Sequence, residues 1–207
     1  MTKVLMINGS PHQKGCTYTA LQECAKVLNS HGIETEILWI GNQEVRGCIA
    51  CGRCREIGRC IFDDQVNQVA SRTDEFDGLI VGSPVFYAGP SGQITSFLDR
   101  LFYIAGSRLQ KKPAASIVSC RRGGASAAYD RLNKYFEIAN MPVVTSQYWN
   151  QIHGNTAEEA LQDAEGLQTM RTLGENMAWL LACIEAGRKA GVPEPVYEAK
   201  TYTNFIR

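Results

Sequence analysis

Residues 3–30 constrain the fold more than any other part of the chain. Residues 4–7 form an apolar run of strand length, and residues 8–11, Asn-Gly-Ser-Pro, interrupt it with turn-forming chemistry. Apolar residues then recur at helical spacing between residues 21 and 28. The stretch therefore predicts a buried strand, a loop rich in small and hydroxyl residues, and a helix, in that order.

This loop has the features of a phosphate site, because free N–H groups and the positive end of the helix dipole point into it. Ser10 and Thr17 add hydroxyl groups, and Gly15 allows close approach of the backbone to an anion. The loop lacks the G-x-G-x-x-G fingerprint of tightly bound dinucleotides and the G-x-x-x-x-G-K-[ST] motif of nucleotide hydrolases. An ordinary connection between a strand and a helix is the alternative.

Four more apolar runs of strand length alternate with helical patterns, at residues 35–40, 76–82, 114–118 and 141–145. This alternation predicts an α/β fold, a doubly wound five-stranded parallel sheet with helices on both faces. We expect residues 1–190 to form one domain with a cysteine-rich insertion at 46–62. Residues 191–207 are expected to form a C-terminal arm, either a dimer contact or a loosely packed end.

The composition narrows the class of protein. Lys and Arg together number 21, as do Asp and Glu, so no overall field favours nucleic acid or an anionic membrane. No apolar run reaches the ~18 residues that span a bilayer, and no signal-peptide pattern precedes the first strand. We therefore expect a cytoplasmic protein, whose eight cysteines are thiols or metal ligands before they are disulfides.

Three loops leave the carboxyl ends of the predicted strands with suitable chemistry, at residues 8–17, 83–92 and 119–124. Ligands of open parallel sheets bind beyond these strand ends. We therefore expect the three loops to converge on one ligand.

Three ordered motifs resemble the flavodoxin-like NADPH-dependent FMN reductases. They are Asn8-Gly9-Ser10-Pro11 with Gly15-x-Thr17, Gly82-Ser83-Pro84-Val85-Phe86-Tyr87, and Leu98-Asp99-Arg100. With the cysteines at 48, 51, 54 and 60, the chain resembles the iron–sulfur flavoprotein branch. The resemblance covers about residues 3–145. It implies non-covalently bound FMN and a homodimer or homotetramer.

Carried over by position, the resemblance implies that Ser10, Thr17 and backbone groups of residues 15–17 hold the FMN phosphate. Pro84 to Tyr87 would flank the isoalloxazine ring, and residues 119–124 would close over its other side. Arg121 or Arg122 would face the flavin, contact the nicotinamide phosphate or stay solvated. The implied FMN residues are Ser10, His12, Gly15, Cys16, Thr17, Pro84, Val85, Phe86, Tyr87, Ser119, Arg121, Gly123 and Gly124. His12 and Cys16 depart from the residues common in the family.

Four cysteines, Cys48, Cys51, Cys54 and Cys60, lie within thirteen residues at C-x₂-C-x₂-C-x₅-C spacing. This compact spacing favours a 4Fe–4S cluster over mononuclear zinc, which normally uses two separated knuckles. Arg46, Arg53, Arg55 and Arg59 would stabilise the negative charge of a cluster, or form a solvated loop with nearby glutamates. Free thiols, zinc and a disulfide are the alternatives.

These observations predict an FMN-dependent oxidoreductase. Electrons would pass from NAD(P)H through FMN to a small acceptor such as a quinone, an azo or nitro compound or free flavin, with a 4Fe–4S cluster as a further carrier. Since the flavin carries the chemistry, no catalytic side chain is expected. Tyr148, Trp149 and His153 are candidates for lining the substrate pocket. One alternative is an electron-transfer protein that accepts electrons from ferredoxin, and another is a thiol redox sensor.

Overall fold

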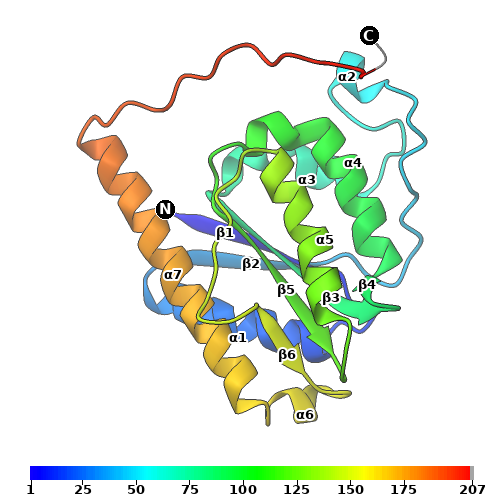
Figure 1. The fold of residues 1–207 in the computed structure, drawn as a ribbon, viewed down its shortest axis with the longest axis vertical. Coiled ribbons are helices and arrows are strands. Elements are labelled where there is room, and N and C mark those ends of the chain that lie inside the picture. Colours follow the sequence, from blue (N-terminus) through cyan, green and yellow to red (C-terminus); the bar gives the residue numbers. More distant parts are fainter. Residues whose placement is uncertain (206–207) are drawn as a thin grey trace.

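The computed structural model describes residues 1–205 and has a parallel sheet at its centre (Figure 1). The strands in order across the sheet are β2 (Glu34–Trp39), β1 (Lys3–Asn8), β3 (Gly78–Phe86), β5 (Ala114–Cys120) and β6 (Gln151–His153). A short strand, β4 (Gly89–Pro90), pairs antiparallel with the end of β3 and completes the six strands. The order matches the 2-1-3-4-5 arrangement of flavodoxin-like sheets, and the predicted doubly wound α/β fold is confirmed.

Helices cover both faces of the sheet (Figure 1). The helical elements are α1 (Cys16–Ser30), α2 (Cys54–Ile57), α3 (Gln65–Ser71), the 3₁₀ turn η1 (Thr73–Glu75), α4 (Gly92–Leu109), α5 (Ala125–Ile138), α6 (Ala157–Ala160) and α7 (Ala164–Lys189). Buried residues of α1 and α7 pack with Val4 and Met6 of β1, whereas those of α3, α4 and α5 pack with Leu5 and Ile7. The alternation of side chains along a strand thus serves two separate cores, which explains the continuous apolar run of β1.

The fifth strand lies in a different place from the one predicted. Residues 141–145 make only a single parallel bridge, between Val143 and Ala114. Pro142 has no N–H to donate to the ladder, and after Thr145 the chain turns, with the Ser146 hydroxyl donating to the carbonyl of Tyr148. The segment that pairs with the end of β5 is β6, where Gln151 lies opposite Val118.

One further boundary differs from the prediction. β3 continues through residues 83–86, which were expected in a loop, and Pro84 lies opposite Ser119 of β5. The last helix, α7, runs through Gly166 and Gly174 without interruption. A Cβ at Gly174 would lie 2.8 Å from the Cβ of Val27, so this glycine allows α7 to pack closely on α1.

The packed structure ends with α7, and an exposed C-terminal segment follows it. Residues 191–205 follow α7 without helix or strand and are exposed. An ion pair between Lys111 and Glu194 joins the start of this arm to the body. Within residues 1–205, no helix combines the length and apolar character needed to cross a membrane.

Candidate functional site

The three predicted loops meet at the carboxyl edge of the sheet, defined here as residues 8–17, 83–92 and 119–124. The N–H of Gly9 donates to the carbonyl of Gly82 over 2.9 Å, and the Ser91 hydroxyl donates to the carbonyl of Gly9 over 2.7 Å. The hydroxyls of Thr17 and Ser119 lie 2.8 Å apart. Direct hydrogen bonds therefore join the first loop to each of the other two.

The first loop is held by its own hydrogen bonds. Ser10 is buried, and its hydroxyl oxygen accepts from the N–H of His12 at 3.1 Å. Its N–H donates to the side-chain oxygen of Asn8, and its carbonyl accepts from the Trp39 indole at 2.8 Å. The Ser10 hydroxyl thus shapes the turn that leads into α1.

Thr17 and Ser119 form a buried hydroxyl pair. Thr17 is 1% exposed and Ser119 is 4% exposed. The pair ties the first turn of α1 to the end of β5. In this arrangement the Thr17 hydroxyl is paired with Ser119. A bound phosphate would therefore have to share the Thr17 hydroxyl with Ser119 or take the place of Ser119 as its partner.

The turn between β3 and β4 presents two aromatic rings at the carboxyl edge. Phe86 is 47% exposed and Tyr87 is fully exposed, so neither ring belongs to the core. Tyr87 and Ala88 both have positive φ, at 50° and 60°, as in a type I′ hairpin turn. Non-glycine residues adopt this conformation at a cost in free energy, and such strain clusters at binding sites.

The third loop packs against this hairpin. Gly124 has φ of +90°, and a Cβ there would lie 2.8 Å from the Cα of Ala88. A glycine is therefore required at 124, whereas a Cβ at Gly123 would meet open space. Arg121 and Arg122 are exposed.

Two helices begin at the carboxyl edge without a side-chain cap. Their N-cap residues are Gly15 for α1 and Gly124 for α5, and a glycine has no side chain to accept a hydrogen bond from the helix. By contrast, Asp64, Ser91, Thr156 and Asp163 cap α3, α4, α6 and α7. The first N–H groups of a helix have no intrahelical partner, so uncapped ends favour an anion. Together with the aromatic hairpin, these ends fit a flavin mononucleotide.

Two cysteines and a histidine lie beside the carboxyl edge. The Cys16 thiol, predicted as an FMN residue, donates to the carbonyls of Gly154 and Thr156. The Cys120 Sγ lies 3.4 Å from Nδ1 of His153. Burial raises the pKa of both the Cys16 and Cys120 thiols above the ordinary value, so both stay protonated at neutral pH.

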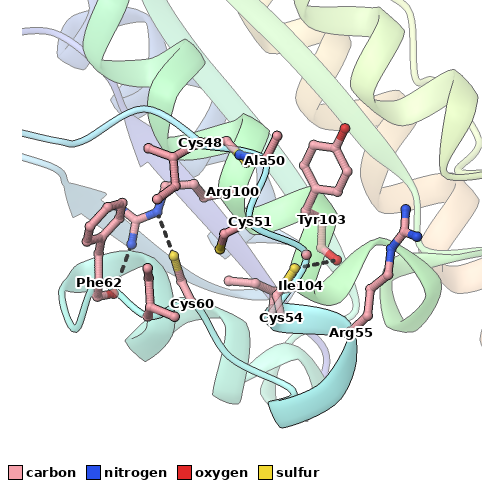
Figure 2. Close-up of a pocket in the computed structure, with 13 residues that line it drawn as sticks. Cys48, Ala50, Cys51, Cys54, Arg55, Cys60, Phe62, Arg100, Tyr103 and Ile104 are labelled. Atoms are coloured by element: carbon pink, nitrogen blue, oxygen red, sulfur yellow. Dashed lines mark hydrogen bonds between the residues drawn. The ribbon is translucent and has the colours of Figure 1, made fainter.

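The four clustered cysteines line one cavity of about 240 Å³, which we name the four-cysteine pocket (Figure 2). Its walls are the irregular segment before α2, the start of α2, the segment after α2, and the middle of α4. Arg100, Tyr103 and Ile104 are the wall residues from α4. The cysteine-rich insertion therefore folds onto α4.

Cys60 is the most firmly held of the four. Its sulfur accepts a hydrogen bond from Nε of Arg100 at 3.2 Å. The side chain of Asn67 accepts from its N–H at 2.8 Å and donates to its carbonyl at 3.0 Å. Side chains from α3 and α4 thus fix both the backbone and the sulfur of this residue.

The other three cysteines have weaker partners. The Cys48 sulfur accepts from the N–H of Ala50 at 3.4 Å, and the Cys54 sulfur lies 3.9 Å from the carbonyl of Tyr103. Cys48 and Cys51 are exposed. Among residues 1–205, no group of three or more His, Cys, Asp or Glu side chains converges closely enough to hold a single metal ion. Four thiols that line one cavity, with N–H groups directed at the sulfurs of Cys48 and Cys60, have the chemistry to serve as ligands of a cluster.

The sequence named Arg100 only within the Leu98-Asp99-Arg100 motif and did not indicate its role beside the cysteines, where its Nε contacts the Cys60 sulfur. Arg46, Arg53 and Arg59 are exposed and pair with Glu44, Glu56 and Asp63. Of the four arginines predicted to surround the cysteines, Arg55 lines the pocket. The available signal was the position of Arg100 three residues after Phe97, on the apolar face of its helix.

Arg100 is 1% exposed and bridges α4 to the cysteine segment. Its two terminal nitrogens donate to both carboxylate oxygens of Asp64, at 2.6 and 2.9 Å, and to the carbonyls of Arg46 and Phe62. Burial lowers the pKa of the guanidinium, but hydrogen bonds to Asp64 and Cys60 outweigh burial and raise it overall. The side chain is therefore a permanent buried cation facing a sulfur.

The sequence of this chain is similar to those of known proteins. The family model for NADPH-dependent FMN reductases matches residues 2–156. The chain is 32% identical over 191 residues to an iron–sulfur flavoprotein of Methanocaldococcus jannaschii, covering 88% of this chain and 99% of that relative.

Solved structures agree on the fold. A structure of RosB with a bound flavin-derived intermediate has a TM-score of 0.70 at 15% identity, covering 100% of this chain and 94% of that one. A flavodoxin from the domain Archaea has a TM-score of 0.60 at 14% identity, covering 88% and 99%. The family match and the relative support an FMN-dependent oxidoreductase. The chain belongs to the flavodoxin-like NADPH-dependent FMN reductase family, in its iron–sulfur flavoprotein branch.

Proposed function

We propose that this protein passes electrons from NAD(P)H through bound FMN to a small acceptor, and that its four-cysteine pocket holds a 4Fe–4S cluster. The acceptor class comprises quinones, azo or nitro compounds and free flavin. The observation that carries the proposal is the joint presence, at one sheet edge, of two uncapped helix ends and a strained aromatic hairpin. We further propose that the protein acts in the cytoplasm as a homo-oligomer, with residues 1–190 as the FMN-binding unit.

At the carboxyl edge, the backbone N–H groups of residues 15–17 hold the phosphate, with the hydroxyls of Ser10 and Thr17 beside them. Phe86 and Tyr87 would contact the flavin ring, and the segment from Ser119 to Gly124 would also contact it. Arg121 would supply positive charge to the flavin. Bound FMN supplies hydride acceptance and electron transfer. The protein binds and orients both the flavin and the nicotinamide.

At the four-cysteine pocket, Cys48, Cys51, Cys54 and Cys60 serve as thiolate ligands. The shared cavity and the hydrogen bond from Arg100 to Cys60 support this assignment. Cys48 and Cys51 are exposed, so the pocket is open to an external redox partner.

This openness favours a second candidate function, a carrier that accepts electrons from ferredoxin through the cluster without nicotinamide. Stopped-flow reduction of the anaerobic flavoprotein separates the two. Flavin bleaching by NADPH or NADH supports the reductase. Bleaching by reduced ferredoxin, with none by either nicotinamide, supports the carrier.

The first experiment is an absorption spectrum with an iron and a flavin assay on protein purified without oxygen. We expect flavin bands and about four irons per chain, as one 4Fe–4S cluster requires. Flavin without iron would remove the cluster from the proposal. Protein that is colourless and does not take up added FMN would contradict the proposed function as a whole.

A further inference from the structure

Arg100 is an unusual residue for the interior, because a buried guanidinium is costly unless every donor is paired. All three of its nitrogens find acceptors, and its charge is matched by Asp64 in a two-point ion pair. The ring of Phe62 lies 5.3 Å from the guanidinium carbon. This complete pairing fixes the direction of the remaining bond, from Nε to the Cys60 sulfur.

Among the acceptors around Arg100, the Cys60 sulfur needs a separate explanation, because a cation is directed at it. A neutral thiol accepts hydrogen bonds weakly. A thiolate accepts a charge-assisted bond from a guanidinium, which is about twice as strong as a neutral one. The pairing of a permanent cation with Cys60 therefore suits a sulfur that carries negative charge, as a cluster ligand does.

Cys60 differs in this respect from the other three cysteines. The donor to Cys48 is a backbone N–H on an exposed segment, and the contact of Cys54 is with a carbonyl oxygen. A buried charged donor acts in a lower dielectric and is screened less by solvent. The hydrogen bond from the buried cation Arg100 is thus directed at the Cys60 sulfur, whereas Arg55, which also lines the pocket, is exposed.

We propose that Arg100, held in direction by Asp64, is a positioning residue that raises the reduction potential of a cluster bound by the four cysteines. The inference rests on the proposed function, which places the cluster in this pocket. An electron added to a cluster increases the negative charge on its sulfur ligands, so an N–H donor stabilises the reduced form more than the oxidised form. Arg100 transfers no proton, and no bond to it forms or breaks. In the titration below, the electron comes from dithionite.

Asp64 acts in the opposite direction, because its carboxylate places negative charge behind the guanidinium. Removal of the Arg100 cation leaves this carboxylate unpaired near the sulfur and lowers the potential. Removal of the Asp64 charge leaves the cation unopposed and raises the potential. These opposite signs distinguish an electrostatic role from a purely structural one.

The test compares Arg100→Gln, Arg100→Lys and Asp64→Asn with the wild-type protein, each purified anaerobically with its cluster. The Asp64→Asn side chain retains an oxygen that can cap α3. Arg108→Gln, at an exposed position near the end of the same helix, is the matched control. The midpoint potential is measured by a dithionite titration that follows the electron paramagnetic resonance signal of the reduced cluster.

We expect Arg100→Gln to lower the ratio of reduced to oxidised cluster at a fixed potential by about tenfold, which corresponds to about 59 mV for one electron. Arg100→Lys should fall between Arg100→Gln and wild type, since one ammonium can pair with Asp64 but lacks the planar fork. Asp64→Asn should raise the potential, and Arg108→Gln should match the wild type.

Unchanged potentials in loaded Arg100→Gln and Asp64→Asn proteins would overturn this inference and leave the proposed function intact. A wild-type protein that takes up no iron would overturn this inference together with the cluster part of the proposed function, and would leave the proposed flavin chemistry standing. If Arg100→Gln does not retain a cluster, Asp64→Asn decides the matter: an upward shift supports the inference, and no shift or a downward shift overturns it. An equal shift in Arg108→Gln would also overturn it.

Discussion

The carboxyl edge and the four-cysteine pocket are built in opposite ways. The edge is formed by the ends of regular strands and the starts of helices, and in the proposed function backbone groups would hold most of the ligand. The pocket is formed by an irregular segment folded onto the side of α4, and in the proposed function side chains would supply its metal ligands. We infer that the edge keeps its shape through the sheet, whereas the pocket depends on a few polar contacts centred on Arg100.

The largest effect should follow from Arg100→Met, which breaks the pocket and spares the edge. This change leaves the carboxylate of Asp64, which is 33% exposed, without its buried partner. Because solvent reaches this carboxylate, the cost should be less than the ~3 kcal/mol of a fully buried pair. We expect the free energy of unfolding, from urea titrations of iron-free protein, to fall by about 2 kcal/mol. Arg108→Met, exposed on the same helix, should change it little. A loss below about 1 kcal/mol would show that the pocket does not depend on this contact.

Gly124→Ala should have the opposite pattern to Arg100→Met, because it should damage the carboxyl edge and leave the four-cysteine pocket intact. The left-handed backbone costs a side chain about 1–2 kcal/mol, and the added Cβ would lie 2.8 Å from the Cα of Ala88. We expect the affinity for FMN, measured by fluorescence titration, to fall by about tenfold with iron content unchanged.

Gly32→Ala is the matched control, since this glycine also has a positive φ, a Cβ there meets open space, and it lies outside the carboxyl edge, so its effect on FMN affinity should be smaller. An equal loss in both variants would mean that the loop tolerates the clash at 124. Loss of iron in Gly124→Ala would mean that the two regions are coupled.

Thr17→Val tests whether the edge uses side chains as well as backbone. In iron-free and flavin-free protein it leaves the buried Ser119 hydroxyl unpaired, which should lower the free energy of unfolding by about 1 kcal/mol. If the Thr17 hydroxyl also turns to the FMN phosphate, FMN affinity should fall by a further factor of about ten. Thr17→Ser keeps the hydroxyl and should keep the affinity. A stability loss with unchanged affinity would restrict Thr17 to joining α1 and β5.

The contrast between regular elements at the carboxyl edge and distant side-chain contacts at the four-cysteine pocket explains what the sequence could predict. Residues 3–30 were assigned correctly because strand, turn and helix each leave a local pattern, and the three strand ends converge by the geometry of a parallel sheet. β6 was missed because Gln151 and His153 are polar, and their strand character comes from pairing with β5. The role of Arg100 was missed because its partners Cys60 and Asp64 are 40 and 36 residues away in the chain. Contacts between side chains far apart in the chain produce no periodic pattern in the local sequence.

The smallest expected effect is a loss of stability at low pH, which involves the ion pair between Glu36 and Arg72. Hydrogen bonds from Arg72 and Lys3 lower the pKa of Glu36 to about 2. Arg72 ends α3, the helix that supplies Asn67 to the four-cysteine pocket, so Glu36 ties that helix to β2. Because the folded pKa lies below the ordinary value of 4.5, this contribution is present above pH 4.5 and is lost as pH falls towards 2.

Solvent screening limits the contribution of Glu36 to less than about 1 kcal/mol. Glu36→Gln should therefore lower the free energy of unfolding at pH 7 by that amount and flatten its fall between pH 5 and pH 3. The urea midpoints of both proteins across this range provide the measurement, and Glu75→Gln, which removes the exposed partner of Arg72, is the matched control.

Loss of iron before loss of flavin as pH falls would sharpen the comparison, because it would show that the pocket depends on α3 while the edge depends on the sheet. Simultaneous loss would contradict the independence of the two regions.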